Sequence, residues 1–274
     1  MKKIIDCHTH LQTKQLIEEY YKDCKGFAIV MKALDSLIGN GDDIYEEISH
    51  FDNIFLCECV DAFSKTSIED QLKTIEQHLQ QYKIVGIKIY LGYQPIFADD
   101  KKLFTVYDFA EKHNLSIVFH CGMLVETLQK KTKFNYSSCL PIAKIAKKYP
   151  KVNFIVSHFD YPNLQDCLKV ITENKNVFTD ISGQYENYDN KPYEDLKNLY
   201  LEELTCALKN FNKQDILTKV MFGTDYFGKG SGFDEVETYV STLDAMFGKK
   251  NKKLYLYENC LHAYPKIKEY INKK

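Results

Sequence analysis

Short apolar segments alternate with longer amphipathic segments along the whole chain of 274 residues. The short segments are rich in Ile, Val and Phe, as expected for parallel strands that are buried on both faces. Eight strands are predicted, at Lys3–His8, Gly26–Met31, Ile54–Val60, Val85–Tyr90, Ser116–His120, Val152–His158, Asn176–Ile181 and Lys219–Thr224.

The intervening segments repeat apolar residues every three or four positions, which is typical of helices that pack one face against a sheet. The segment Ile68–Gln81 shows this spacing clearly, with Leu72, Ile75 and Leu79 on one face. The segment Leu34–His50 is the least regular, because a Gly-Asn-Gly sequence interrupts it. The other helices are predicted at Phe104–His113, Leu140–Tyr149, Leu164–Glu173, Leu196–Phe211, Phe233–Phe247 and His262–Asn272.

Eight strands that alternate with helices predict a (β/α)8 TIM barrel of the α/β class. The rival fold is an open, doubly wound sheet, which would place a glycine-rich phosphate-binding turn after the first strand. His8-Thr9-His10 stands at that position instead. We therefore expect residues 1–274 to form one TIM-barrel domain, since barrels of this size are routinely single.

Composition narrows the class of protein. The net charge is −2 at pH 7 and all 36 basic residues are Lys, which gives no sign of a nucleic-acid or membrane partner. The N-terminus lacks the apolar core of a secretory signal, and the nine cysteines lack Cys-x-x-Cys spacing, so free thiols are expected. We therefore expect a cytoplasmic protein that binds a small-molecule substrate, and a homodimer stays an open alternative.

Polar side chains stand at the carboxyl ends of several predicted strands, which is the face where barrel enzymes build their sites. His8 and His10 end the first strand, and residues two apart in a strand point to the same side. His120 ends the fifth strand, His158 ends the sixth, and Asp225 follows the eighth. Each residue alone is also compatible with a structural role, but together the imidazoles and the carboxylate indicate a metal site. Zn²⁺ suits this donor set, with Mn²⁺, Fe²⁺ or Co²⁺ as alternatives.

Two further ionisable residues lie close to this set. Lys88 lies inside the fourth strand, and because a buried ammonium group needs a partner, we expect it to face the barrel mouth and bind substrate. Asp6 precedes His8 by two residues and is a candidate to hydrogen-bond a metal-bound imidazole, with a structural carboxylate as the alternative.

These segments resemble the amidohydrolase superfamily, and specifically its amidohydrolase-related (amidohydrolase 2) branch of metal-dependent TIM-barrel hydrolases. The resemblance implies that His8, His10, His120 and Asp225 bind the metal, and that His158 is catalytic or binds a second metal. The similar segments are Ile5-Asp6-Cys7-His8-Thr9-His10, Val85–Tyr90, Ala98-Asp99-Asp100, Ile117–Gly122, Tyr149–His158, Asn176–Gly183, Phe222–Tyr226 and Glu258-Asn259.

The resemblance also bears on Lys88 and on one departure from the family pattern. In the superfamily a lysine at this place can be carboxylated and bridge two metals, but we favour a bare ammonium beside a single metal, the common state of this branch. Phe227 stands where the family often has Pro.

The implied activity is a metal-dependent hydrolase that acts on a small carbonyl substrate, such as a lactone, ester or amide. The metal would activate water, Asp225 would be the general base, and His158 would stabilise the oxyanion or donate a proton. The main alternative is a non-oxidative decarboxylase or hydratase of a small aromatic or unsaturated carboxylic acid. A metal-dependent nuclease and a silent binding module are weaker alternatives. The lack of Arg favours the hydrolase, because only Arg offers a carboxylate two parallel hydrogen bonds.

Overall fold

Eight parallel strands form one sheet whose order follows the sequence from β1 to β8. The structure is a computed structural model, and it describes residues 3–34, 43–124, 135–184, 192–228 and 236–272. The strands are β1 Ile5–Thr9, β2 Phe27–Met31, β3 Ile54–Cys59, β4 Ile84–Ile89, β5 Ser116–Phe119, β6 Phe154–Val156, β7 Val177–Asp180 and β8 Val220–Met221.

The segment after β8 closes the sheet into a barrel. The amide of Asp225 donates to the carbonyl of His8 at 2.8 Å. Thr9 and Tyr226 form a parallel bridge one step further along. Because of this pairing, Asp225 lies beside the histidine at the end of β1, although the two residues are far apart in sequence.

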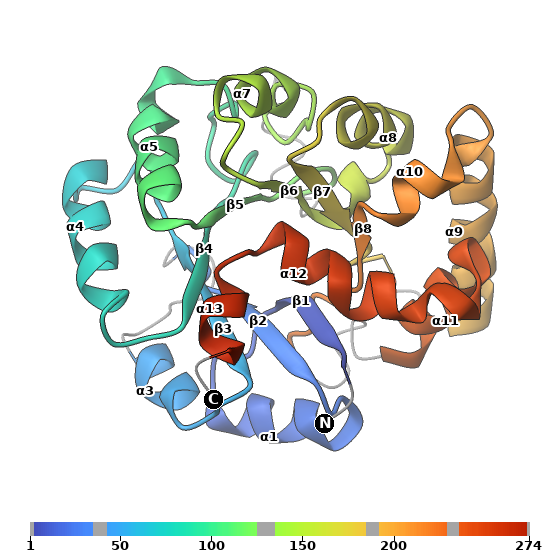
Figure 1. The fold of residues 1–274 in the computed structure, drawn as a ribbon, viewed down its shortest axis with the longest axis horizontal. Coiled ribbons are helices and arrows are strands. Elements are labelled where there is room, and N and C mark those ends of the chain that lie inside the picture. The colour runs from blue at the N-terminus through green and yellow to red at the C-terminus, as the bar shows by residue number, and fades with distance from the viewer. Residues whose placement is uncertain (1–2, 35–42, 125–134, 185–191, 229–235, 273–274) are drawn as a thin grey trace.

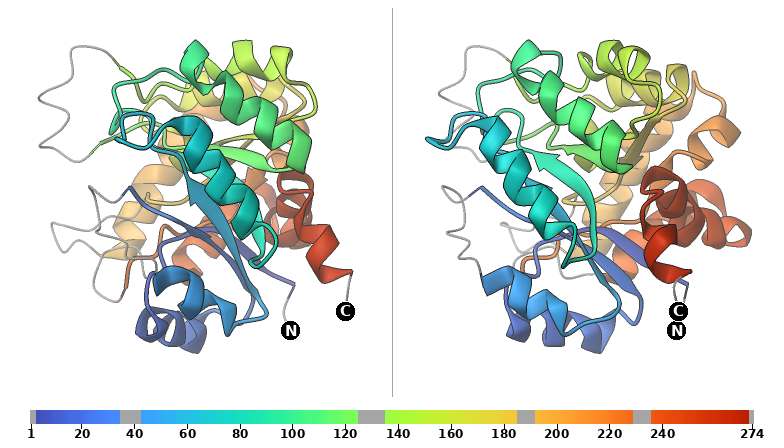
Figure 2. Two further views of the ribbon diagram at one scale, coloured as in Figure 1. Left: turned by 90° about the vertical axis from the view of Figure 1, so that its left-hand side faces the viewer. Right: turned by 60° about the vertical axis from the view of Figure 1, so that its left-hand side comes forward.

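Helices surround the barrel on the outside, and Figures 1 and 2 show α12 and α13 across one end of it. Among the described residues, no helix combines the length and apolar character needed to cross a bilayer. The α-helices are α1 Lys14–Asp23, α3 Asp43–Ser49, α4 Ile68–His78, α5 Phe104–His113, α7 Ile142–Lys148, α8 Leu164–Glu173, α9 Tyr193–Leu208, α10 Lys213–Leu217, α11 Val236–Phe247, α12 Asn259–Ala263 and α13 Ile267–Ile271. Shorter turns are the 3₁₀ helices η1 Lys101–Leu103, η2 Ser157–Asp160 and η3 Lys249–Asn251, and the π-helix η4 Leu254–Glu258.

All eight predicted strands are confirmed, each to within three residues at either end. The prediction of one final helix was wrong, because α12 and α13 are separate. Pro265 lies between them, and proline can neither donate a backbone hydrogen bond nor continue a helix. Helix α1 was not predicted, although Thr13 caps it by accepting a hydrogen bond from the amide of Leu16. Within the irregular segment 34–50 the structure describes α3, and residues 35–42 lie outside the described part.

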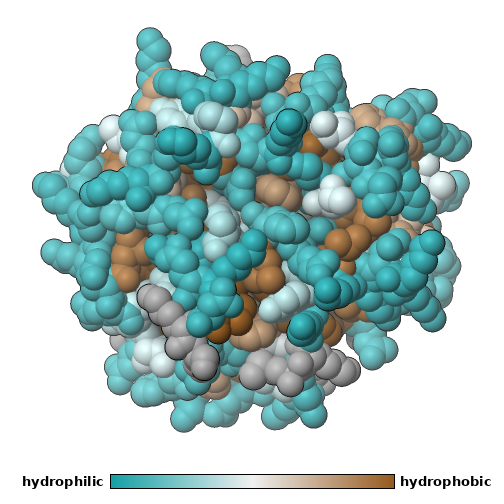
Figure 3. All heavy atoms as spheres, viewed as in Figure 1, coloured by the Kyte–Doolittle hydropathy of each residue, from teal (hydrophilic) through white to brown (hydrophobic). Residues whose placement is uncertain are grey.

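The barrel interior is filled by apolar side chains below the carboxyl ends of the strands. Residues of β1 to β8 such as Ile29 and Phe55 pack there against Cys260 of α12, Ile267 of α13 and Tyr264 between the two helices. Helices α12 and α13 thus plug the amino-terminal end of the barrel, and the outer surface of this face is mostly hydrophilic (Figure 3). This packing leaves the opposite end, where the strands finish, for a functional site.

Two glycines with positive φ angles differ in how tightly the surrounding chain packs against them. Gly122 (φ +83°) and Gly248 (φ +82°) have nearly the same φ angle, but a Cβ at Gly122 would overlap the carbonyl oxygen of Tyr161, whereas no atom of the described residues would lie within 4 Å of a Cβ at Gly248. We expect Gly248→Ala to lower the free energy of unfolding by about 1–3 kcal/mol, the cost of a positive φ angle for a residue with a Cβ. Gly122→Ala should cost at least about 1 kcal/mol more, because the backbone must also shift. Urea denaturation of both variants measures this difference, and equal destabilisation would contradict it.

Candidate metal centre

The carboxylate of Asp225 faces two imidazoles from the end of β1. Its Oδ1 lies 3.4 Å from Nε2 of His8 and 3.2 Å from Nε2 of His10. This oxygen is buried, yet no contact with it has the geometry of a hydrogen bond among the described residues. Nδ1 of His10 is also buried and has no hydrogen-bond partner among the described residues. Nitrogen and oxygen atoms that converge without hydrogen-bond geometry are arranged as the ligands of a cation are.

A strained turn brings His158 to the same place. His158, Phe159 and Asp160 all have positive φ angles, between 53° and 60°, and Asp225 has a φ angle of 66°. Residues other than Gly uncommonly have a positive φ angle, although Asn, Asp and His adopt it more often than the rest, and such strain clusters at functional sites. His8, His158 and Asp225 each offer one ligand atom within 4.8 Å of the other two.

Gly183 makes room for this cluster. Its φ angle is +71°, and a Cβ at this position would lie 3.0 Å from Nδ1 of His158 and 3.3 Å from Oδ2 of Asp225. A side chain here would press on both residues, so the absence of one keeps the space beside them open.

Asp180, at the end of β7, holds two of these histidines, and its role was not predicted. Its Oδ2 lies 3.3 Å from Nδ1 of His8. Its Oδ1 accepts hydrogen bonds from the backbone amide of His158 at 3.0 Å and from the amide and hydroxyl of Ser182 at 3.1 and 2.5 Å. The strand-end rule that identified the other site residues would also have identified Asp180.

Asp6 does not have the predicted contact with an imidazole ring. It accepts hydrogen bonds from the amide and hydroxyl of Thr224 at 3.1 and 2.8 Å, from Tyr20 at 2.9 Å, and from the backbone amide of His8 at 3.3 Å. Burial raises the pKa of Asp6 to about 7, although these hydrogen bonds lower it. Asp6 therefore fixes the backbone on either side of the site, and Asp180 orients the imidazole.

The other two predicted ligands lie at the edge of the cluster. Nε2 of His120 lies 3.0 Å from the carbonyl oxygen of Met123, and the ring centre is 4.9 Å from that of His158. The ring of His10 stacks on Phe227, with 4.1 Å between centres and 13° between planes. The structure therefore brings both His8 and His10 to Asp225, groups His8 and Asp225 with His158, and leaves Nε2 of His120 facing a backbone carbonyl.

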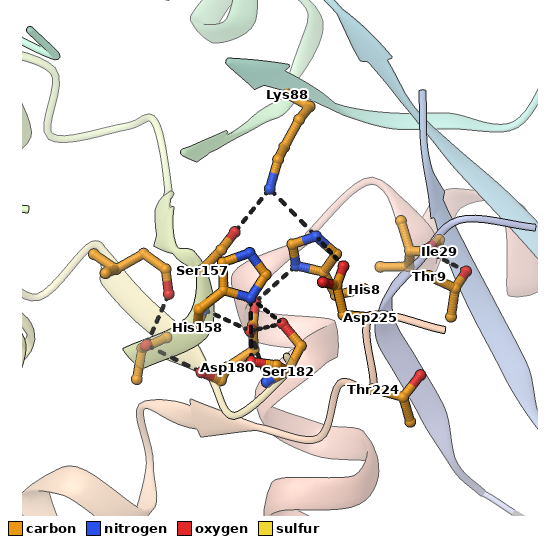
Figure 4. Close-up of polar contacts among 12 residues, drawn as sticks. His8, Thr9, Ile29, Lys88, Ser157, His158, Asp180, Ser182, Thr224 and Asp225 are labelled. Atoms are coloured by element: carbon orange, nitrogen blue, oxygen red, sulfur yellow. Dashed lines mark hydrogen bonds and ion pairs between the residues drawn. The ribbon is translucent and has the colours of Figure 1, made fainter. Parts of the chain in front are cut away.

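Lys88 points into the barrel from β4, toward His8 and Ser157 (Figure 4). It is fully buried. Its Nζ donates to the hydroxyl of Ser157 at 2.9 Å and lies 3.3 Å from Nε2 of His8. Burial lowers the pKa of this amino group. Lys88 is therefore part of the hydrogen-bond network of the site.

The charges of these groups suit a cation. Burial lowers the pKa values of His8, His10 and His120, and lowers that of His158 to about 4, so these imidazoles are neutral at pH 7. Burial opposes ionisation of Asp225 too, but the neighbouring imidazoles outweigh it and hold the pKa of this carboxyl well below its usual range.

Asp180 is ionised for a similar reason. Burial would raise the pKa of its carboxyl, but His8 and the other hydrogen-bonding groups outweigh burial and lower it. Two buried carboxylates, those of Asp180 and Asp225, thus lie in a cluster that contains one amino group, that of Lys88, and several neutral imidazoles. This excess of negative charge and of neutral nitrogen donors fits a divalent metal ion.

Comparisons with known proteins agree with this fold. A TM-score of 0.67 relates the chain to an amidohydrolase from Burkholderia multivorans with bound HEPES, at 15% identity over 96% of this chain and 99% of that one. A probable 2-pyrone-4,6-dicarboxylic acid hydrolase from Acinetobacter baumannii, with citric acid bound, gives 0.66 at 13% identity over 96% and 99%. The 5-carboxyvanillate decarboxylase of Sphingomonas paucimobilis gives 0.61 at 8% identity over 97% and 99%.

Sequence comparison identifies the family. No curated protein sequence matches the chain significantly. The family model described as amidohydrolase, however, matches residues 62–265, which is well over half of the chain and includes every described strand from β4 to β8. The chain therefore belongs to the amidohydrolase family.

Proposed function

We propose that this protein is a metal-dependent hydrolase of a small carbonyl substrate, such as a lactone, ester or amide. The observation that carries the proposal is the convergence of His8, His158 and Asp225, whose ligand atoms lie within 4.8 Å of one another. Membership of the amidohydrolase family supports a hydrolytic reaction, and the position of the cluster at the carboxyl ends of the strands supports an active site.

The metal would be held by His8, Asp225 and His158, with His10 in reach of the same carboxylate oxygen and His120 further out. When bound there, a divalent metal lowers the pKa of water and polarises a carbonyl group. Zinc suits nitrogen and carboxylate donors, and Mn²⁺, Fe²⁺ and Co²⁺ stay alternatives.

The protein's own groups would move the protons of the reaction. Asp225 is ionised, so it can take a proton from the attacking water and pass it to the leaving group. If His120 rather than His158 binds the metal, His158 borders the same space and can stabilise the developing oxyanion once it carries a proton. Lys88 would orient the substrate or these imidazoles from the floor of the site, since its amino group already contacts His8.

The lack of guanidinium groups favours hydrolysis over decarboxylation. The chain contains no Arg, so a substrate carboxylate would have to be gripped by Lys or by the metal. Among the described residues of the site, the only ammonium is that of Lys88, which already donates to Ser157. The sequence also places a tyrosine-rich loop at Gln184–Tyr193, which we expect to stack on a substrate ring; of this loop residues 185–191 lie outside the described part, and Tyr193 begins α9.

Decarboxylation is the second candidate. The structural likeness to the 5-carboxyvanillate decarboxylase supports it at the level of the fold. The same aspartate and histidines would serve, because a metal can itself hold a carboxylate.

Metal analysis tests the site. Protein never exposed to chelator should carry about one equivalent of a transition metal, and His8→Ala or Asp225→Asn should reduce it below about a tenth. Comparison of His158→Asn with His120→Asn shows which imidazole binds, and we expect the larger loss of affinity from His158→Asn because His120 Nε2 faces a backbone carbonyl.

His50→Asn is the control for these metal measurements, since His50 is exposed and far along the chain from every strand end of the site. Two equivalents per chain, together with the added mass of carbon dioxide on Lys88, would contradict the single-metal site. Metal that survives both His8→Ala and Asp225→Asn would contradict the site itself.

A substrate panel tests the reaction. Metal-loaded protein should hydrolyse at least one member of a set of lactones, esters and amides, and Asp225→Asn should slow it by at least about 10²-fold, because the variant loses the general base together with a metal ligand. Hydroxybenzoate-type and muconate-type acids are assayed beside them for release of carbon dioxide. Carbon dioxide release that depends on Asp225, without turnover of any ester or lactone, would establish the decarboxylase instead.

A further inference from the structure

We propose that Asp180 is a positioning residue that selects the tautomer of His8. The proposal goes beyond the ligand set, because it says which nitrogen of His8 carries the proton and which residue decides it. Its consequence for metal binding rests on the proposed function, but the tautomer itself is a property of the metal-free protein.

Both ends of the His8 ring indicate the same tautomer. Nδ1 faces Oδ2 of Asp180 at 3.3 Å, and an ionised carboxylate can only accept a hydrogen bond. Nε2 faces the amino group of Lys88 at 3.3 Å, and an ammonium group can only donate. Nε2 also lies 3.4 Å from Oδ1 of Asp225, but among the described residues that oxygen receives no contact with hydrogen-bond geometry. The proton therefore belongs on Nδ1, and the lone pair of Nε2 lies on the side of Lys88 and Asp225.

The same carboxylate reaches His158 through Ser182. Nδ1 of His158 lies 2.9 Å from the hydroxyl oxygen and 3.1 Å from the carbonyl oxygen of Ser182. The hydroxyl donates its own proton to Oδ1 of Asp180 at 2.5 Å, so both oxygens of Ser182 are left to accept. His158 is therefore also protonated on Nδ1, which leaves the lone pair on its Nε2.

Substitution of Asp180 by asparagine has a defined outcome, because the two oxygens of the carboxylate have different neighbours. Oδ1 receives the backbone amides of His158 and Ser182, which can only donate. The amide oxygen of an asparagine must therefore occupy the Oδ1 position. Its NH₂ group then faces Nδ1 of His8 and donates to it, so the proton of His8 moves to Nε2.

This change would leave the fold in place but prevent Nε2 of His8 from binding a metal. Asparagine has the shape of aspartate and keeps the hydrogen bonds at Oδ1, but Nε2–H of His8 would now point at Lys88 and Asp225 and could not bind metal. In serine proteases the same substitution beside the catalytic histidine preserves the geometry and selects the wrong tautomer.

Long-range ¹H–¹⁵N spectra of histidine-labelled, metal-free protein measure the tautomers directly, and His8→Gln and His158→Gln variants assign the signals. We expect both histidines to carry the proton on Nδ1 in the native protein. In Asp180→Asn, His8 should change to the Nε2–H form, whereas His158 should keep Nδ1–H because Ser182 still accepts from it. His158 is thus the internal control in the same spectrum.

Metal titration of Asp180→Asn completes the test, with an expected loss of affinity of about 10–100-fold, the usual effect of removing a group that orients a ligand. His8 protonated on Nε2 in the native protein, or unchanged in Asp180→Asn, would overturn the proposal, and the native spectrum decides even if the variant does not fold. A changed tautomer with unchanged metal affinity would uphold the role of Asp180 and contradict His8 as a metal ligand.

Discussion

The buried carboxylate of Asp180 is the interaction on which the geometry of the site depends. It is fully buried, and an unpaired charge in such a place would be strongly destabilising. Four groups on three different strand ends satisfy it: the ring of His8, the amides of His158 and Ser182, and the hydroxyl of Ser182. Since these groups meet only in the closed barrel, the carboxylate couples the closure of the fold to the positions of two imidazoles.

Strained backbone is the second constraint on the site. His158 and Asp225 both have left-handed backbone, and each such residue costs about 1–3 kcal/mol that the rest of the structure must offset. The surrounding hydrogen bonds explain how this strain persists. The amide of Asp225 is bonded to His8, and Asp6 holds Thr224 immediately before it, so the loop after β8 has no freedom to relax.

Much of the fold was predictable because buried parallel strands and amphipathic helices have different apolar periods, and both periods are clear in this chain. Strand ends then identified His8, His158 and Asp225 as neighbours. The face of Asp6 was not predictable, because the register with β2 shifts between Asp6 and Thr9 and breaks the simple alternation of side chains. The orientation of the His120 ring was not predictable either, because it depends on a contact with one loop carbonyl, that of Met123. The left-handed turn at His158 contains no glycine, so the sequence gives no sign of it.

The central claim is that His8, His158 and Asp225 form one metal site, and anomalous diffraction from crystals soaked in Zn²⁺ or Mn²⁺ tests it most directly. The account predicts one peak at the carboxyl ends of β1, β6 and β8, about 2.0–2.2 Å from Nε2 of His8, a ring nitrogen of His158 and Oδ1 of Asp225. A fully loaded crystal with no peak there, or with its strongest peak elsewhere, such as beside His78 and Glu58, would contradict it.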